Sequence, residues 1–176
     1  MGLAHPFHDF DNEAFAKLAV KKLVARGRRH LALLAPPPAL TYSKHTHLGF
    51  EHGLRQHGLT GVPLTSIDVD TPLLRVREAS RQLAAGHHRP DGIVCSALRT
   101  SFAVVAGLES AGLVIGSDFD IVTKHSTELQ QILRPEIIAI PEDFHRAGFD
   151  AARMVMAWLN GADPTGLQHL EAPQDT

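Results

Sequence analysis

The sequence has a single cysteine, Cys95, among its 176 residues. One cysteine excludes an internal disulfide and a cysteine-rich metal site, and it fits a reducing compartment. No apolar run approaches the roughly 20 residues that a membrane-spanning helix needs. Met1 to His8 lack the basic start and the apolar centre of a secretion signal. Together these absences predict a cytoplasmic protein.

The sequence also lacks an excess of charge of one sign. It has 17 Lys and Arg against 19 Asp and Glu, a formal net charge of -2. This balance gives no global electrostatic reason to expect nucleic acid or an anionic membrane as a partner of these residues. The hydrophobic fraction of 44% is ordinary for a globular protein, and the length allows one large domain or two lobes.

Known catalytic motifs are missing as well. No G-x-G-x-x-G follows an apolar run, and neither a P-loop lysine motif nor a G-x-S-x-G elbow is present. Because no nucleophile, base and orienting group can be assembled, we expect neither an enzyme nor a cofactor. The histidines nearest to a metal-site spacing are His45 with His47, and His87 with His88. Residues two apart do not share a helix face, so we expect no metal site.

What the sequence does contain is a regular alternation of helical and extended patterns. Residues 1–10 fit an entry strand or a linker. The predicted helices are 11–27, 42–57, 72–85, 100–111 and 141–159, and the predicted strands are 31–35, 63–69, 93–95, 119–123, 133–140 and 167–170. Gly49 and Gly53 weaken the second helix. The alternation predicts an α/β fold, an open parallel sheet flanked by helices, with ligands at the carboxyl ends of its strands.

Short motifs also follow one another in a particular order and spacing along nearly the whole chain. They are Asp11-Asn12, Gly27-Arg28-Arg29-His30-Leu31, Pro36-Pro37, Gly49-Phe50, Arg89-Pro90-Asp91-Gly92, Ala111-Gly112-Leu113, Asp118-Phe119-Asp120, Leu133-Arg134-Pro135, Ile140-Pro141-Glu142-Asp143, Gly148 and Ala151-Ala152. Each motif is weak alone. In this order they make the chain resemble the LacI/GalR bacterial transcription regulators.

The resemblance implies a two-lobed core of the type I periplasmic binding protein-like fold. Residues 1–176 would be its effector-binding region and would contain mainly the carboxyl-terminal lobe. Residues 12–132 would form that lobe, residues 136–160 would return to a missing amino-terminal lobe, and residues 166–172 would be the final crossover strand. The resemblance also implies that the chain is truncated from a longer protein with a DNA-binding head.

The resemblance further implies effector contacts at the strand ends. The candidates are Lys44, His45, Thr46, Asp70, Arg99, Lys124, His125 and Phe144. Thr46 stands where the family usually has an arginine, Ala97-Leu98 where it often has Asn-Asp, and His125 where it often has an aspartate. Acidic groups are thus lost while Lys44, Arg99 and Lys124 add positive charge. Such a site favours a carboxylate or phosphate over a neutral sugar, unless these cations point to solvent and the site has drifted.

We therefore expect a non-enzymatic, effector-sensing and dimerising region of a LacI-type regulator. Its ligand would be a small sugar or sugar-like molecule, and operator DNA would be bound only through a head absent from this chain. The apolar residues Leu129, Ile132, Leu133 and Pro135, with the helix 100–111, would form the homodimer interface. A solute-binding protein of a transport system is the alternative, and a small α/β enzyme is a third possibility.

Overall fold

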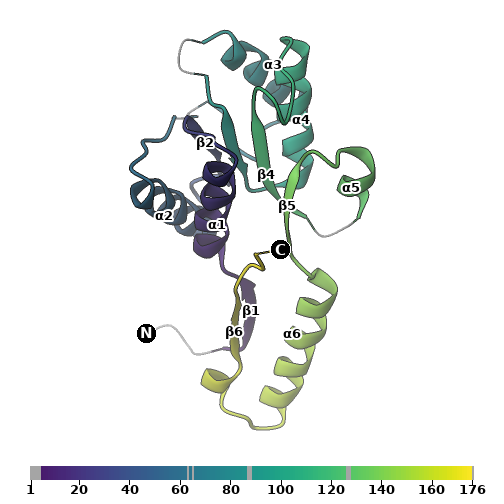
Figure 1. Cartoon of the computed structure of the whole chain (residues 1–176). Coiled ribbons are helices and arrows are strands. Elements are labelled where there is room, and N and C mark those ends of the chain that lie inside the picture. Colours follow the sequence, from purple (N-terminus) through teal and green to yellow (C-terminus); the bar gives the residue numbers. More distant parts are fainter. Residues whose placement is uncertain (1–4, 63, 65, 87–88, 126–127, 176) are drawn as a thin grey trace.

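The computed structural model describes residues 5–62, 64, 66–86, 89–125 and 128–175 (Figure 1). Its elements are β1 (Phe7–Phe10), α1 (Asn12–Ala25), β2 (Leu31–Leu34), α2 (Thr41–Gln56), α3 (Leu73–Ala84), β3 (Gly92–Cys95), α4 (Leu98–Ser110), β4 (Asp120–His125), α5 (Leu129–Leu133), β5 (Ile138–Pro141), α6 (Phe144–Leu159), the 3-10 helix η1 (Pro164–Gly166) and β6 (Gln168–Glu171). Helices and strands alternate as predicted, except that α2 is followed by α3. Within the described part of the chain, no helix is long and apolar enough to span a bilayer.

The strands form two separate parallel sheets. The larger sheet has the order β2-β3-β4-β5, and β1 pairs with β6 in a sheet of its own. Neighbouring residues of the larger sheet point to opposite faces, so Leu33 and Val94 join a core with α1 and α2, while Leu34 and Ile93 join a core with α3 and α4. Helix α6 extends away from the larger sheet, alongside β1 and β6 (Figure 1). We call the larger sheet with α1 to α5 the sheet body, and β1, β6 and α6 the small unit.

The contact between α1 and α2 explains the two glycines inside a predicted helix. A Cβ atom at Gly49 would lie 2.0 Å from the backbone oxygen of Glu13, and one at Gly53 would lie 2.8 Å from Cβ of Val20. The glycines lower the intrinsic helix propensity of α2, but they let α1 approach α2 more closely than a Cβ atom at either position would allow. Tertiary contact therefore decides the conformation here.

Local signals mark both ends of α1 and the start of α6. The carboxylate of Asp11 accepts a hydrogen bond from the backbone N–H of Ala14, and that of Asp143 accepts one from Arg146 N–H, each at 2.8 Å. Gly27, directly after α1, has φ of +86°, which favours glycine. The expectation that Pro141 belongs to the first turn of α6 is wrong, because Pro141 ends β5.

Among the described residues of the predicted strand 63–69, no regular strand is found; Pro63 and Thr65 lie outside the described residues. Val62 makes a single bridge to Ala32, and the N–H of Val69 donates to the carbonyl of Ala35 at 3.0 Å. The apolar pattern instead reflects packing, because Val69 is buried in the core under α3 and α4. Asp68 then accepts hydrogen bonds from the N–H groups of Asp70 and Thr71 and forms a turn.

The predicted strand 133–140 is wrong in its first half. Leu133 is the last residue of α5, and the strand begins only at Ile138. The cause is Gln130, whose side chain is buried and donates to the carbonyls of Arg134 and Ile137 at 2.7 and 2.6 Å. These bonds hold the chain in a turn where the apolar pattern alone favours a strand.

A buried ion pair lies at the amino end of β4. Asp120 has no solvent exposure, and its Oδ2 lies 2.7 Å from Nε of Arg28 and 3.0 Å from Nε of Arg26. Both arginines follow α1. Their ion pairs with Asp120 join the α1–β2 connection to the centre of the sheet.

Candidate functional site

Because the strands of the sheet body are parallel, their carboxyl ends meet at one edge, which we call the carboxyl edge. All predicted effector contacts belong to segments that leave the strands at this edge. Lys44, His45 and Thr46 lie in the first turns of α2, Asp70 in the turn before α3, Arg99 in the first turn of α4, Lys124 and His125 at the end of β4, and Phe144 at the start of α6.

At the start of α2, Lys44 and His45 are exposed, whereas Thr46 is fully buried. The hydroxyl of Thr46 donates to the carbonyl of Tyr42 at 2.9 Å, within the same helix. His45 borders a surface hollow of about 330 Å³ that also contacts the start of α1 and Leu170 of β6. Of the three predicted contacts in α2, Lys44 and His45 therefore have accessible side chains, and Thr46 does not.

The start of α4 is held against the turn that contains Asp70. The hydroxyl of the buried Thr100 donates to the carbonyl of Val69 at 2.9 Å, and Nη2 of Arg99 lies 3.4 Å from the same oxygen. Arg99 and Asp70 are both exposed. The guanidinium of Arg99 thus lies against the residue that precedes Asp70.

Lys124 differs from the other predicted cations because its charge is already paired. Its Nζ lies 2.9 Å from Oε1 of Glu142 and donates to Oδ1 of Asn12 at 2.6 Å. The side chains of Lys124 and Glu142 are only 13% and 10% exposed, and the ammonium also lies 4.9 Å from the ring centroid of Phe15. Lys124 therefore ties β4 to the connections that lead into α1 and α6.

These connections come together in one place. A small cavity is lined by residues of the β1–α1 connection, of the β5–α6 connection and of the segment after β6; these include Asp11, Glu142 and Pro173. Phe144 begins α6 beside it, 55% exposed, with its ring edge-on to Phe10 at a centroid distance of 5.2 Å. We call these three connections the crossovers. Sequence reasoning missed Asn12 and Glu142, although both lie in motifs on which the resemblance rests.

Cys95 ends β3 at the same edge, but it is no candidate nucleophile. Burial raises the pKa of its thiol to about 12. The thiol therefore stays protonated at neutral pH, and the thiolate that would attack a substrate does not form.

The residues predicted for a dimer interface are exposed. Leu129, Ile132 and Leu133 are 53%, 75% and 58% exposed along α5, and Pro135 follows them at the surface. The guanidinium of Arg134 pairs with the carboxylate of Glu109 on α4, and this contact raises the pKa of Arg134. This ion pair joins the end of α5 to α4.

Comparison with known proteins accounts for this arrangement. Residues 20–174 match the family described as periplasmic binding protein-like domain. The chain belongs to this family. Among its relatives, the HTH-type transcriptional regulator AglR of Rhizobium meliloti is 26% identical over 168 residues, which are 90% of this chain and 46% of that protein. The HTH-type transcriptional regulator GntR of Escherichia coli is 27% identical over 160 residues, covering 89% of this chain and 46% of the relative.

Solved structures agree with the fold. A regulatory protein of LacI family from Chloroflexus aggregans superposes with a TM-score of 0.85 at 21% identity, over 99% of this chain and 63% of the other. The transcription regulator CcpA of Lactococcus lactis gives a TM-score of 0.84 at 14% identity, over 96% and 62%. The predicted LacI/GalR resemblance and the predicted parallel α/β fold are therefore confirmed. The chain spans about half the length of the curated relatives that it matches.

Proposed function

We propose that this chain is the effector-sensing part of a LacI-type transcriptional regulator that works in the cytoplasm and is not an enzyme. The observation that carries the proposal is the carboxyl edge itself. Exposed polar side chains from separate segments, among them Lys44, Asp70 and Arg99, gather where open α/β sheets bind ligands. The crossovers lie next to this edge, so a ligand bound there contacts the place where the sheet body joins the small unit.

The ligand that we propose is a small sugar or sugar-like molecule held between the sheet body and a second lobe. That second lobe would contain the small unit, and residues 136–160 would run from one lobe to the other. Because Lys124 is paired with Glu142, a preference for an acidic sugar would depend on Arg99 and Lys44. Thr46, His125 and Phe144 remain predicted contacts.

The mechanism would be a shift between two lobe arrangements. A ligand that contacts both lobes favours the arrangement in which both sets of contacts form, and the affinity of an attached DNA-binding head changes by the same coupling free energy. The contacts of Lys124 with Asn12 and Glu142 join the crossovers to β4. They are therefore the contacts that such a rearrangement would strain first.

Calorimetry on a protein containing this chain and the preceding part of its reading frame tests the proposal. Matched pairs of an aldose with its aldonate or its phosphate are titrated in parallel. We expect saturable binding that Arg99→Ala weakens, with a larger loss for the acid if the anionic preference holds. Lys21→Ala, far from the carboxyl edge on α1, is the matched control for removal of a cation. If no member of the panel binds, the proposed class of effector is contradicted.

The reading frame also separates this proposal from its rival. A helix-turn-helix upstream supports a regulator, whereas a secretion signal supports a solute-binding protein of a transport system. For the homodimer, light scattering of Leu133→Asp is the test, because a charge on the exposed α5 surface should yield a monomer. An unchanged mass places the interface elsewhere.

A further inference from the structure

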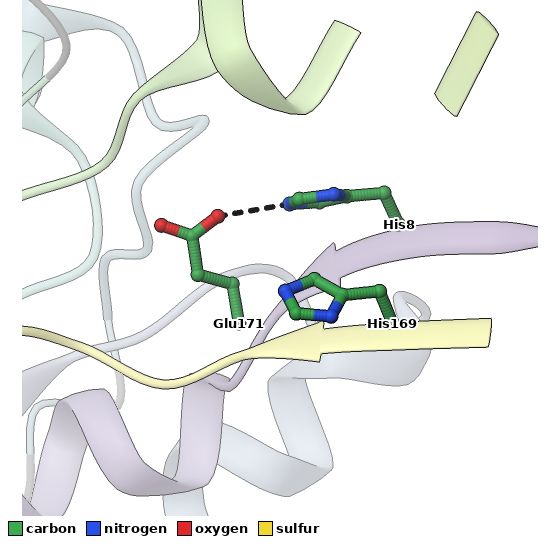
Figure 2. A group of neighbouring side chains, drawn as sticks. All are labelled: His8, His169 and Glu171. Atoms are coloured by element: carbon green, nitrogen blue, oxygen red, sulfur yellow. Dashed lines mark hydrogen bonds and ion pairs between the residues drawn. The ribbon is translucent and has the colours of Figure 1, made fainter. Parts of the chain in front are cut away.

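Two histidines and a glutamate gather on one face of the small unit, and the proposed function uses none of them. In the parallel pairing of β1 with β6, His8 lies opposite His169, so both side chains point to the same face. Glu171 follows His169 by two positions along β6 and shares that face. Figure 2 shows the three side chains together, with the dashed contact running from His8 to Glu171.

The geometry of this group, which we call the His–His–Glu cluster, is close to that of a metal site. One ligand atom from each residue can be chosen so that all three lie within 4.8 Å of one another. Nε2 of His8 and Oε2 of Glu171 are already 2.9 Å apart. The ligands of a tetrahedral zinc ion lie about 3.3 Å apart when each bond is about 2.0–2.1 Å. Small side-chain rotations therefore suffice to close the cluster around an ion.

The burial of His8 gives a second, independent indication. Its side chain is only 2% exposed, and its Nδ1 has no hydrogen-bond partner within the described part of the chain. Buried polar atoms are usually paired, so an unpaired imidazole nitrogen calls for an explanation. A ligand that binds Nδ1 is one, because the contact of this ring with Glu171 uses Nε2.

The cluster is also accessible. His169 and Glu171 line a cavity of about 610 Å³ between β6 and α6. His169 is exposed, and the side chain of Glu171 is 25% exposed. On the opposite wall of the cavity, Nε of Arg146 lies 2.8 Å from Oδ2 of Asp150. Asp150 as well as Glu171 therefore faces the arginines of this cavity. An ion can enter from solvent without unfolding the strands.

We propose that His8, His169 and Glu171 bind a divalent transition-metal ion of the zinc class. Two imidazoles and one carboxylate are typical ligands of Zn²⁺, whereas Mg²⁺ and Ca²⁺ prefer oxygen atoms alone. The fourth position faces the cavity and takes water or an acidic group of a ligand. The ion ties β1 to β6. No spacing in the sequence marks this site, because His8 and Glu171 are 163 positions apart.

Calorimetric titration of the 176-residue chain with zinc chloride tests the site, with magnesium chloride as a second titrant. We expect one saturable zinc site per chain and no saturable magnesium site. His169→Ala removes an exposed ligand, so the fold should be retained, as circular dichroism will check. It should weaken zinc binding by more than about tenfold, since even outer-shell changes cost about 10–100-fold at such sites. Glu171→Gln should weaken it in the same direction.

His52→Ala is the matched control. Nδ1 of His52 lies 2.9 Å from the carboxylate of Glu13, so it makes the same kind of contact as His8, but it belongs to no three-residue group within the described residues. Zinc should raise the melting temperature of the wild type and of His52→Ala, but not that of His169→Ala. No saturable zinc site, or an equal loss of affinity in His52→Ala and His169→Ala, overturns the proposal. Either result leaves the effector proposal untouched.

Discussion

The sheet body and the small unit differ in how far each completes its own core. Every residue of β2 and β3 is buried, and helices cover both faces of the sheet. α6, in contrast, has no buried residue, and its Phe149, Met156 and Leu159 are 58%, 59% and 72% exposed. A two-stranded sheet is only marginally stable alone. Since the chain spans about half the length of its relatives, we propose that the rest of the second lobe covers this apolar surface.

The largest expected effect comes from truncating one phenylalanine in each of the two regions. Phe119 is fully buried in the sheet body, so Phe119→Ala should lower the free energy of unfolding by about 3–5 kcal/mol. Phe149 is exposed on α6, so Phe149→Ala should change it by less than about 0.5 kcal/mol. Urea denaturation followed by circular dichroism measures both. Equal losses would show that the small unit has a core after all.

A pair of glycines sharpens the comparison by the sign of the effect. Gly49→Ala places a Cβ atom 2.0 Å from the backbone oxygen of Glu13 and must push α1 and α2 apart, which should destabilise the chain by about 3 kcal/mol. At Gly148, in α6, a Cβ atom meets nothing within 4 Å. Gly148→Ala should therefore stabilise by about 0.5–1 kcal/mol through helix propensity. Melting curves of the two variants should move in opposite directions. A Gly49→Ala variant that melts no lower than the wild type would refute the close helix contact.

Loss of the contact between Lys124 and Glu142, which joins the two regions, should have a smaller effect on stability. Lys124→Met leaves the carboxylate of Glu142 largely buried without its cation, which should cost about 1–2 kcal/mol. Lys21→Met removes an ammonium from an exposed pair with Asp175 and should leave the melting temperature unchanged. If both variants melt alike, the contacts of Lys124 do not hold the crossovers.

The smallest expected effect concerns an exposed pair of a carboxylate and an arginine, and each of the two regions contains such a pair. Hydrogen bonds from Arg81 and then from Gln82 lower the pKa of Glu78 in α3 to about 2, from an ordinary value of 4.5. A hydrogen bond from Arg146 likewise lowers the pKa of Asp150 in α6. Glu78 is more acidic in the folded state, so its stabilising contribution is present above pH 4.5 and is lost as the pH falls toward 2. The pKa of Asp150 shifts in the same direction, so its contribution is likewise lost toward acid pH.

NMR titration of the Glu78 carboxyl carbon measures this shift, and Arg81→Ala should return the pKa toward the ordinary value. Because the pair is exposed, Glu78→Gln should barely change the stability at neutral pH. A midpoint near 4.5 in the wild type would show that the Arg81 contact does not persist in solution.

Local signals carried most of the fold prediction. Asp11 and Gly27 mark the two ends of α1, and each acts through residues only a few positions away in the chain. The sequence alone therefore suffices to predict these ends. The first half of the strand predicted over 133–140 is wrong because Gln130 forms contacts that no period of apolar residues encodes. The candidate site shows the same limit. The position of Lys124 was predictable from the family pattern, but its partners Asn12 and Glu142 come from distant segments.

The parallel pairing of β1 with β6 has a consequence for the order of folding. The contact between His8 and Glu171 joins residues 163 positions apart, so almost the entire chain forms the loop that this pair closes. Closing so long a loop lowers the conformational entropy of the chain before the contacts of the ladder can stabilise it. The β1–β6 ladder therefore forms after the sheet body has brought the crossovers together. In a refolding experiment followed by hydrogen exchange, the amides of Phe7–Phe10 and of Gln168–Glu171 should become protected last.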